Sequence, residues 1–424
     1  MEIVLYRTHD NVNRLILSKP AAEIMIDVFM FLSTLFIGAD VFGVNIGVNL
    51  RLDQLFLVLA AFFMMLENKY RFTKNKWVIT FLFVTFVSTI FAFNFARGVL
   101  FYFSIVYNFI FVFCLYESYV RYYGLKTFIN LFRKTMYIQF IVVIIQSLLK
   151  IVFNVDLPFM PSYGNYMGIE RFCLWFYEPS YFATYVSIWF SISLYMYLVA
   201  KKRNYFKDSI MAFAMIFIST STSGFIAVIL SSLIILFVWL KKDFTFKKIV
   251  VLLLIVSLTI IFMNVFKNVY DVFIARLFEG NLDAASGGRI QRWVETYNVF
   301  CKNVLFGVGP GNYGLYLNQE AGYVPSNVTL ELLATVGLFS TILFYAINFS
   351  CIFIIFSKKY KNVLLIKAVC IALFVFVLIL QINQGYLRLY HWMFLGVIQG
   401  AISGIKHKYE AKYNKRMCGY RYEH

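Results

Sequence analysis

The feature that most constrains this chain is the alternation of positive charge between its long apolar segments. About twelve such segments are separated by loops that are alternately rich and poor in Lys and Arg. If every second loop, beginning with the N-terminal tail, is assigned to the cytoplasm, that side receives 29 of the 39 Lys and Arg residues. Cytoplasmic loops of helical membrane proteins are enriched in these residues. The pattern therefore predicts a polytopic membrane protein with both termini inside.

The lengths and composition of the apolar segments predict helices. Each is close to the ~20 residues that a helix needs to cross the hydrocarbon, and all are too long and uniform for barrel strands. Charged residues make up only 14% of the chain, whereas a soluble domain carries about 25%. We therefore expect an all-α fold of about 12 transmembrane helices, forming a single transmembrane domain over residues 1–424. The segments fall at 22–38, 52–66, 77–93, 99–117, 135–153, 180–200, 208–222, 224–240, 247–265, 328–356, 363–381 and 387–404.

The remaining composition excludes several classes of function. The net charge of +18 is spread thinly over the cytoplasmic loops, where cations anchor the protein beside anionic lipid, so nucleic-acid binding is not expected. The six Cys are scattered and the four His form no cluster, so we predict neither a metal site nor a cofactor. The two longest loops on the side opposite the cytoplasm, 154–179 and 266–327, are where function should be sought.

The loop 266–327, between the ninth and tenth helices, contains an amphipathic pattern. From Arg289 to Val304 apolar residues recur every three or four positions, which predicts a helix lying on the membrane surface or against the bundle. Arg289 and Arg292 stand near its N-terminus. There the helix dipole and two fork-shaped donors would suit a phosphate or diphosphate. The alternative, which spacing alone favours, is that these arginines contact lipid headgroups.

Two further patterns follow in the same loop. Three Gly surround Pro310 in residues 307–313, which predicts a tight structural turn with positive φ values rather than a nucleotide-binding loop. Ser326-Asn327 then precedes the tenth apolar segment, and we expect Ser326 to be its N-cap. Glu331 lies too late in this segment to complete a capping box.

The loop 154–179 ends with Glu178-Pro179, where Pro179 suits the first turn of the sixth helix. A carboxylate at this position could act as a general base toward a sugar hydroxyl. Equally, Glu178 could pair with Arg171 or interact with the helix dipole. In the short turn before the last helix, aromatic residues are expected as an interface belt, so that only Arg388 stands out.

Together, these residues resemble the bacterial O-antigen polymerase and O-antigen ligase superfamily over approximately residues 165–340. The resemblance rests on the order and spacing of short motifs. They are Glu178-Pro179-Ser180-Tyr181, Ser223-Gly224, Gly288-Arg289, Arg292-Trp293, Gly307 to Asn312, Ser326-Asn327, Leu330-Glu331-Leu332 and Gly337-Leu338.

The resemblance implies a GT-C-like glycosyltransferase in the bacterial inner membrane, acting on undecaprenyl-diphosphate-linked glycans at the periplasmic face. A chain-length-determinant protein and membrane lipids are the other partners it suggests. Arg289 and Glu178 become the expected catalytic residues, with Glu178 the first choice of base. The expected contacts to the diphosphate or sugar are Arg171, Arg292, Arg388, Tyr181, Tyr313 and Asn327.

One departure from the family pattern separates its branches. Ligases carry His-Asn at the entry to the helix after the large loop, and here the matching pair is Ser326-Asn327. This favours a Wzy-type polymerase over a ligase. A flippase or other transporter is the third alternative. It would be expected to carry ionisable residues deep in its helices, where Asp27 is almost alone.

The charge alternation predicts a topology that labelling can test. In a background without native cysteines, single cysteines introduced into 154–179 and 266–327 should react with an impermeant maleimide added to the periplasmic side. Cysteines introduced into the Lys-rich loop 67–76 should react only after the membrane is permeabilised. Protection of either long loop from the reagent would contradict the scheme.

Overall fold

The computed structural model describes residues 21–45, 49–160, 162–166, 169–242, 289–319, 323–356 and 363–419. Within them, the chain forms helices and two short hairpins. The helices are α1 (Ala21–Leu35), α2 (Leu52–Leu66), α3 (Lys76–Ile90), α4 (Phe95–Tyr107), η1 (Asn108–Cys114), α5 (Leu115–Tyr123), α6 (Leu125–Phe153), α7 (Pro179–Leu198), α8 (Asn204–Ser219), α9 (Thr222–Lys242), α13 (Arg289–Lys302), α14 (Tyr313–Tyr316), α15 (Val328–Ile352), η2 (Phe353–Phe356), α16 (Leu364–Ile379) and α17 (Leu389–Gly419). The antiparallel hairpins pair β1 (Gly43–Asn45) with β2 (Asn49–Arg51) and β3 (Tyr163–Tyr166) with β4 (Ile169–Arg171).

The helical architecture agrees with the sequence-based expectation. Eleven of the expected segments coincide with helices, and the segment 247–265 lies outside the described residues. The fourth segment is longer than expected, because α4, η1 and α5 form one continuous helix from residue 95 to 123. Among the described residues, four helices are long and apolar enough to cross a membrane, and four shorter ones are also apolar. The chain is a multi-pass helical membrane protein, while the count of twelve spans stays a prediction.

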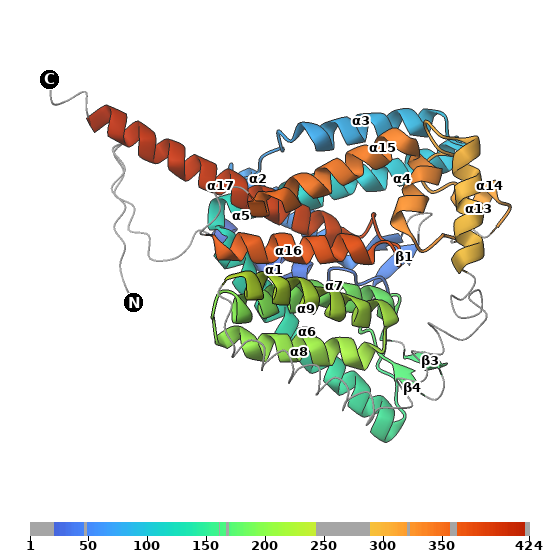
Figure 1. Cartoon of the computed structure of the whole chain (residues 1–424), viewed down its shortest axis with the longest axis horizontal. Coiled ribbons are helices and arrows are strands. Elements are labelled where there is room, and N and C mark those ends of the chain that lie inside the picture. Colours follow the sequence, from blue (N-terminus) through green and yellow to red (C-terminus); the bar gives the residue numbers. More distant parts are fainter. Residues whose placement is uncertain are drawn as a thin grey trace.

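Helix α7 lies in the middle of the bundle, packed against α8, α9 and α16 (Figure 1). Sixteen of its residues are buried, so it is apolar and enclosed all round. Small hydroxyl residues allow the close approach, as is usual between membrane helices. The hydroxyls of Ser191 on α7 and Ser231 on α9 are hydrogen-bonded at 2.7 Å. Pro179 lies in the first turn of α7, as expected. The central position of the helix fixes where this N-terminus lies in the bundle.

One end of the bundle gathers the loops that the sequence analysis singled out. In Figure 1, α13 lies crosswise at the ends of α3 and α15, and the hairpins lie at the same end. The C-terminal part of α17 projects from the opposite end. We call the end that carries α13 and the hairpins the loop end. An orientation of α13 across the bundle axis is the one expected for a helix at a membrane surface.

The glycine-rich turn between α13 and α14 is held by a break in α15. At Gly337 the backbone leaves helical geometry, with φ 75° and ψ −179°. The carbonyls of Ala334 and Thr335 therefore lack their usual helical partners and accept hydrogen bonds from the amides of Val308 and Gly309, at 2.9 and 2.8 Å. The expected turn with positive φ values is present, at 66° for Gly307, 92° for Gly309 and 69° for Gly311.

The expected N-cap of the tenth segment was wrong by one residue. Asn327 is the N-cap of α15, and its side-chain oxygen accepts a hydrogen bond from the amide of Leu330 at 3.0 Å. Ser326 precedes the cap in a left-handed conformation with φ 52°. An Asn is as good a cap as a Ser, so the dipeptide alone did not decide between them.

The close approach at Gly337 gives a test of the kink. A Cβ added there would lie 2.1 Å from the carbonyl oxygen of Leu305, on a backbone with φ 75°. We expect Gly337→Ala to destabilise the protein by at least ~2 kcal/mol, visible as a lower melting temperature in detergent. The control is Gly404→Ala in α17, where the nearest atom to the new Cβ is 3.5 Å away. Equal melting temperatures for the two variants would contradict this account.

Candidate active site

A pocket of about 390 Å³ at the loop end brings together residues from four parts of the chain. We call it the arginine pocket. Its lining includes Glu178 and Ser180 of α7, Arg289 and Arg292 of α13, Ser326 before α15, and Gln384 before α17. The two expected catalytic residues, Glu178 and Arg289, therefore lie in one pocket although 111 positions separate them in the sequence.

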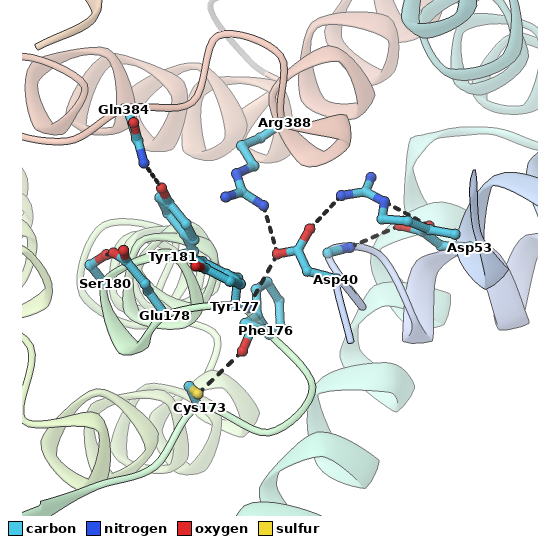
Figure 2. A network of polar contacts seen from close by, with 12 residues as sticks. Asp40, Asp53, Cys173, Phe176, Tyr177, Glu178, Ser180, Tyr181, Gln384 and Arg388 are labelled. Carbon is cyan, nitrogen blue, oxygen red and sulfur yellow. Dashed lines mark hydrogen bonds and ion pairs between the residues drawn. The ribbon is translucent and has the colours of Figure 1, made fainter. Parts of the chain in front are cut away.

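Glu178 is presented to this pocket by the start of α7. It is the N-cap residue, with extended backbone geometry, and Pro179 follows at the first helical position. Its carboxylate accepts a hydrogen bond from the hydroxyl of Ser180 at 3.0 Å, and Figure 2 shows the two side chains side by side. Glu178 is half-buried and makes no side-chain cap with its own helix. The carboxylate thus stays within reach of the pocket.

The arginines of α13 are held beside the pocket by contacts between this helix and residues 323–325. The indole of Trp293 donates a hydrogen bond to the carbonyl of Pro325 at 2.8 Å. The hydroxyl of Tyr323 donates to Glu295 at 2.8 Å, and the guanidinium of Arg292 lies 5.5 Å from the centre of the Tyr323 ring. These contacts bind residues 323–326 to α13, so the arginines and Ser326 keep their relative positions.

A second pocket of about 460 Å³ adjoins the first. We call it the tyrosine pocket. Its lining includes Arg51, Tyr181, Tyr313, Glu331, Tyr386 and Arg388. Tyr323, Val324 and Gln384 line both pockets and form the wall between them. Tyr181, Tyr313 and Arg388, three of the expected substrate contacts, are therefore brought together here and not in the arginine pocket.

Arg388 is fixed by an ion-pair network centred on Asp40 (Figure 2). Asp40 lies 2.6 Å from Arg388 and 2.5 Å from Arg51, and it accepts the backbone amide of Tyr177 at 3.2 Å. Arg51 also lies 3.3 Å from Asp53. Burial on its own would raise the pKa of the Asp40 carboxyl, but the charges of Arg388 and Arg51 outweigh burial and hold this pKa below its ordinary value.

Aromatic rings complete the tyrosine pocket. The guanidinium of Arg388 lies 3.6 Å from the centre of the Tyr181 ring, which also receives a hydrogen bond on its hydroxyl from Gln384. The rings of Tyr313 and Tyr323 are nearly parallel, with centroids 5.9 Å apart. The hydroxyl of Tyr313 is hydrogen-bonded to Thr296 at 2.8 Å, and burial raises its pKa to about 12. The hydroxyl therefore stays protonated.

The other expected contacts lie beside the pockets. Asn327 caps α15 and donates a hydrogen bond to the carbonyl of Gln381 at 2.8 Å, so its amide holds the two segments that flank the site. Arg171 ends β4, outside the lining residues of both pockets. Its role in binding diphosphate stays a prediction.

Sequence reasoning did not find the Asp40 network. Asp40, Arg51 and Asp53 flank the turn between the first two helices, on the side poor in Lys and Arg. A usable signal was present, because ionisable residues beside an apolar hairpin are costly to bury and require partners. Their partner Arg388, however, is 348 positions from Asp40. No local pattern can indicate that pairing.

His391, in α17, is buried and lies 2.9 Å from the side-chain oxygen of Asn348, away from both pockets. In the described part of the chain, no group of three or more His, Cys, Asp and Glu is placed to hold a metal ion. The ionisable groups that line the arginine pocket, apart from Tyr323, are thus one carboxylate and two guanidiniums.

Comparison with known families gives a match that covers part of this site. Residues 209–345 match the family model described as O-Antigen ligase. The matched segment covers about a third of the chain and is similar to the O-antigen polymerase and ligase family. No curated protein matches the chain. Members of the family act on lipid-linked sugars and transfer sugar units. The matched segment includes α13, Ser326 and Glu331, whereas Glu178 and Arg388 lie outside it.

The Asp40 network predicts that removing its central charge will destabilise the loop end. Asp40→Asn leaves two nearby guanidiniums without their shared carboxylate, which should cost roughly 3 kcal/mol and lower the melting temperature by several degrees. Because the folded-state pKa of Asp40 is lowered, the advantage of the wild type should be complete above pH ~4 and fade as the pH falls below it.

The control for this prediction is Asp156→Asn at the same end of the molecule. Asp156 pairs with Lys150 at 2.7 Å but is half exposed, and such surface pairs contribute about 0–1 kcal/mol. A melting temperature for Asp40→Asn as high as that of Asp156→Asn would show that the network does not stabilise the fold.

Proposed function

We propose that this protein is a polysaccharide polymerase, a glycosyltransferase that joins undecaprenyl-diphosphate-linked oligosaccharide repeat units at the periplasmic face of the bacterial inner membrane. The observation that carries the proposal is the lining of the arginine pocket, where Glu178 faces the same space as Arg289 and Arg292. A group that can take a proton and two groups that can bind a leaving diphosphate are the minimum that this transfer needs.

In this proposal, the two arginines hold the diphosphate of the donor. Guanidinium stays protonated and binds phosphate oxygens in pairs, and the N-terminus of α13 adds its dipole in the same direction. When the bond between the anomeric carbon and the diphosphate oxygen breaks, the leaving group keeps the electron pair. Cations already in place stabilise that charge without reorganising at the moment of reaction.

Glu178 takes the role of general base. The acceptor hydroxyl forms the new bond to the anomeric carbon of the donor, and its proton passes to the Glu178 carboxylate. Ser180 donates to the same carboxylate and helps to keep it oriented. No histidine among the described residues lines the pocket, which leaves Glu178 as the base that its lining offers.

The choice of polymerase over ligase rests on Ser326. In the ligase pattern a histidine occupies this position, and here the serine lies in the arginine pocket without a histidine to activate its hydroxyl. The alternative function is ligation of the finished chain to another acceptor, which the description of the matched family model favours. The two activities differ in their products, so an assay can separate them.

The test supplies purified protein with lipid-linked single repeat units and measures the ladder of longer lipid-linked chains. Arg289→Ala should reduce the rate by ~30-fold to ~1000-fold, because a charge-assisted contact to the leaving group contributes ~2–4 kcal/mol in the transition state. Arg289→Lys should recover activity only in part, since it keeps the charge but loses the fork. Glu178→Gln should be far more damaging than Ser326→Ala.

The matched control is Lys302→Ala, which removes an exposed cation from the last turn of the same helix. It should leave the rate close to that of the wild type. Normal ladders from both Arg289→Lys and Glu178→Gln would refute these roles. A cell that lacks the protein but still makes the ladder, and fails only to attach it to its final acceptor, would point to the ligase.

A further inference from the structure

The tyrosine pocket is large enough to hold a ligand of its own. Its volume of about 460 Å³ falls within the range of about 300–1,000 Å³ that is common for small-molecule sites. It shares the wall of Tyr323, Val324 and Gln384 with the arginine pocket, so a group bound here would lie next to the proposed reaction centre. The chemistry of its lining indicates which group that is.

The two pockets differ in their balance of charge. In the arginine pocket, two guanidiniums face one carboxylate. In the tyrosine pocket, the guanidiniums of Arg388 and Arg51 are already paired with Asp40, and Arg51 also with Asp53. Glu331 adds a carboxyl group to its lining. A diphosphate would therefore be disfavoured in the tyrosine pocket, whereas an uncharged ligand would not be repelled.

Glu331 is the group in this pocket that most requires a ligand. It lies in the first turns of α15, and its Oε2 atom is buried without a hydrogen-bond partner among the described residues. Leaving a buried carboxylate oxygen without a donor is costly. Hydroxyl groups are the donors that an uncharged ligand could supply.

The aromatic lining agrees with a hydroxyl-bearing ring. Tyr181, Tyr313, Tyr323, Tyr386 and Phe101 come from different parts of the chain and line one space. A sugar ring presents a face of C–H groups, which can pack against a flat aromatic face, and a rim of hydroxyls, which need polar partners. A carboxylate acceptor, fixed guanidinium donors and several rings offer both kinds of contact.

We propose that the tyrosine pocket is a sugar subsite in which the Glu331 carboxyl group accepts hydrogen bonds from hydroxyls of an uncharged sugar residue. This inference rests on the proposed function and adds to it a second, phosphate-free site. The sugar belongs either to the donor or to the acceptor repeat unit, since both must meet at the arginine pocket. The shared wall then places the bound sugar beside Glu178 and the arginines.

The experiment uses full-length protein and two substrates that can be varied separately. The acceptor is the free oligosaccharide released by mild acid from the native lipid-linked repeat unit, and the donor is the intact lipid-linked unit. Glu331→Gln keeps the shape and replaces the carboxyl group by an amide, and it should raise the KM for one of these substrates by about 10-fold or more. An increase for the free oligosaccharide assigns the pocket to the acceptor, and an increase for the lipid-linked unit assigns it to the donor.

A binding measurement separates this site from the arginine pocket. Glu331→Gln should leave the Kd for undecaprenyl diphosphate within about twofold of wild type, whereas Arg289→Ala should weaken it strongly. Phe101→Leu, on a different helix, is the second variant and should raise the same KM as Glu331→Gln. Asp156→Asn, which removes a carboxylate outside both pockets, is the control.

Unchanged KM values for both substrates in Glu331→Gln and Phe101→Leu would overturn the sugar subsite while leaving the polymerase proposal intact. A loss of undecaprenyl diphosphate binding in Glu331→Gln equal to that in Arg289→Ala would also overturn it, because the two pockets would then be one diphosphate site. Failure of the proposed function is recognised independently, since the wild type would then form no ladder.

Discussion

The Asp40 carboxylate, held between two guanidiniums, is the interaction on which the geometry of the loop end depends. It joins the turn after α1 to Arg51 at the end of β2 and to Arg388 before α17, and the Tyr177 amide brings in the loop before α7. Helices in a membrane gain little from the hydrophobic effect when they pack against each other, so polar contacts at their ends contribute much of the specificity. Without this carboxylate, three loops that line the site would lose their common contact.

The network also decides how charge is divided between the two pockets. Arg388 and Arg51 belong to the same end of the molecule as Arg289 and Arg292, yet their charge is balanced by paired carboxylates. In the proposed function, the diphosphate is therefore assigned to the arginines of α13 and not to Arg388 and Arg51. The neutralised guanidiniums keep their hydrogen-bonding geometry, and Arg388 is further restrained by the ring of Tyr181. Because they are paired with Asp40, Arg388 and Arg51 form a rigid part of the pocket lining and are less suited to bind phosphate.

The sequence predicted the parts of this structure that follow from local physics. Apolar length and charge alternation placed the helices, and the glycines around Pro310 indicated a turn with positive φ values. The preference of proline for the first turn of a helix also predicted the position of Pro179 in α7. It did not separate Ser326 from Asn327 as the cap of α15, since both residue types cap helices well.

The pairing in the site could not be predicted, because it depends on how distant segments pack. Glu178 and Arg289 were expected to act together from the resemblance, and the structure places them in one pocket. The Asp40–Arg388 pair and the wall formed by Tyr323 and Gln384 have no local signature. They arise only when the ends of α1, α7, α15 and α17 meet.

The charge alternation that orients the chain also explains why the arginines of the loop end point to structural or functional roles. Under the predicted topology, the periplasmic side has no need of cations for orientation, and each one kept there requires another reason. The structure supplies such reasons: Arg97 donates to the carbonyl of Gly311 at 2.6 Å and lies 5.0 Å from the centre of the Phe101 ring. Arg51 and Arg388 bind Asp40. Arg289 and Arg292 line the arginine pocket together with Glu178, and in the proposed function their reason is to hold the diphosphate of the donor beside the general base.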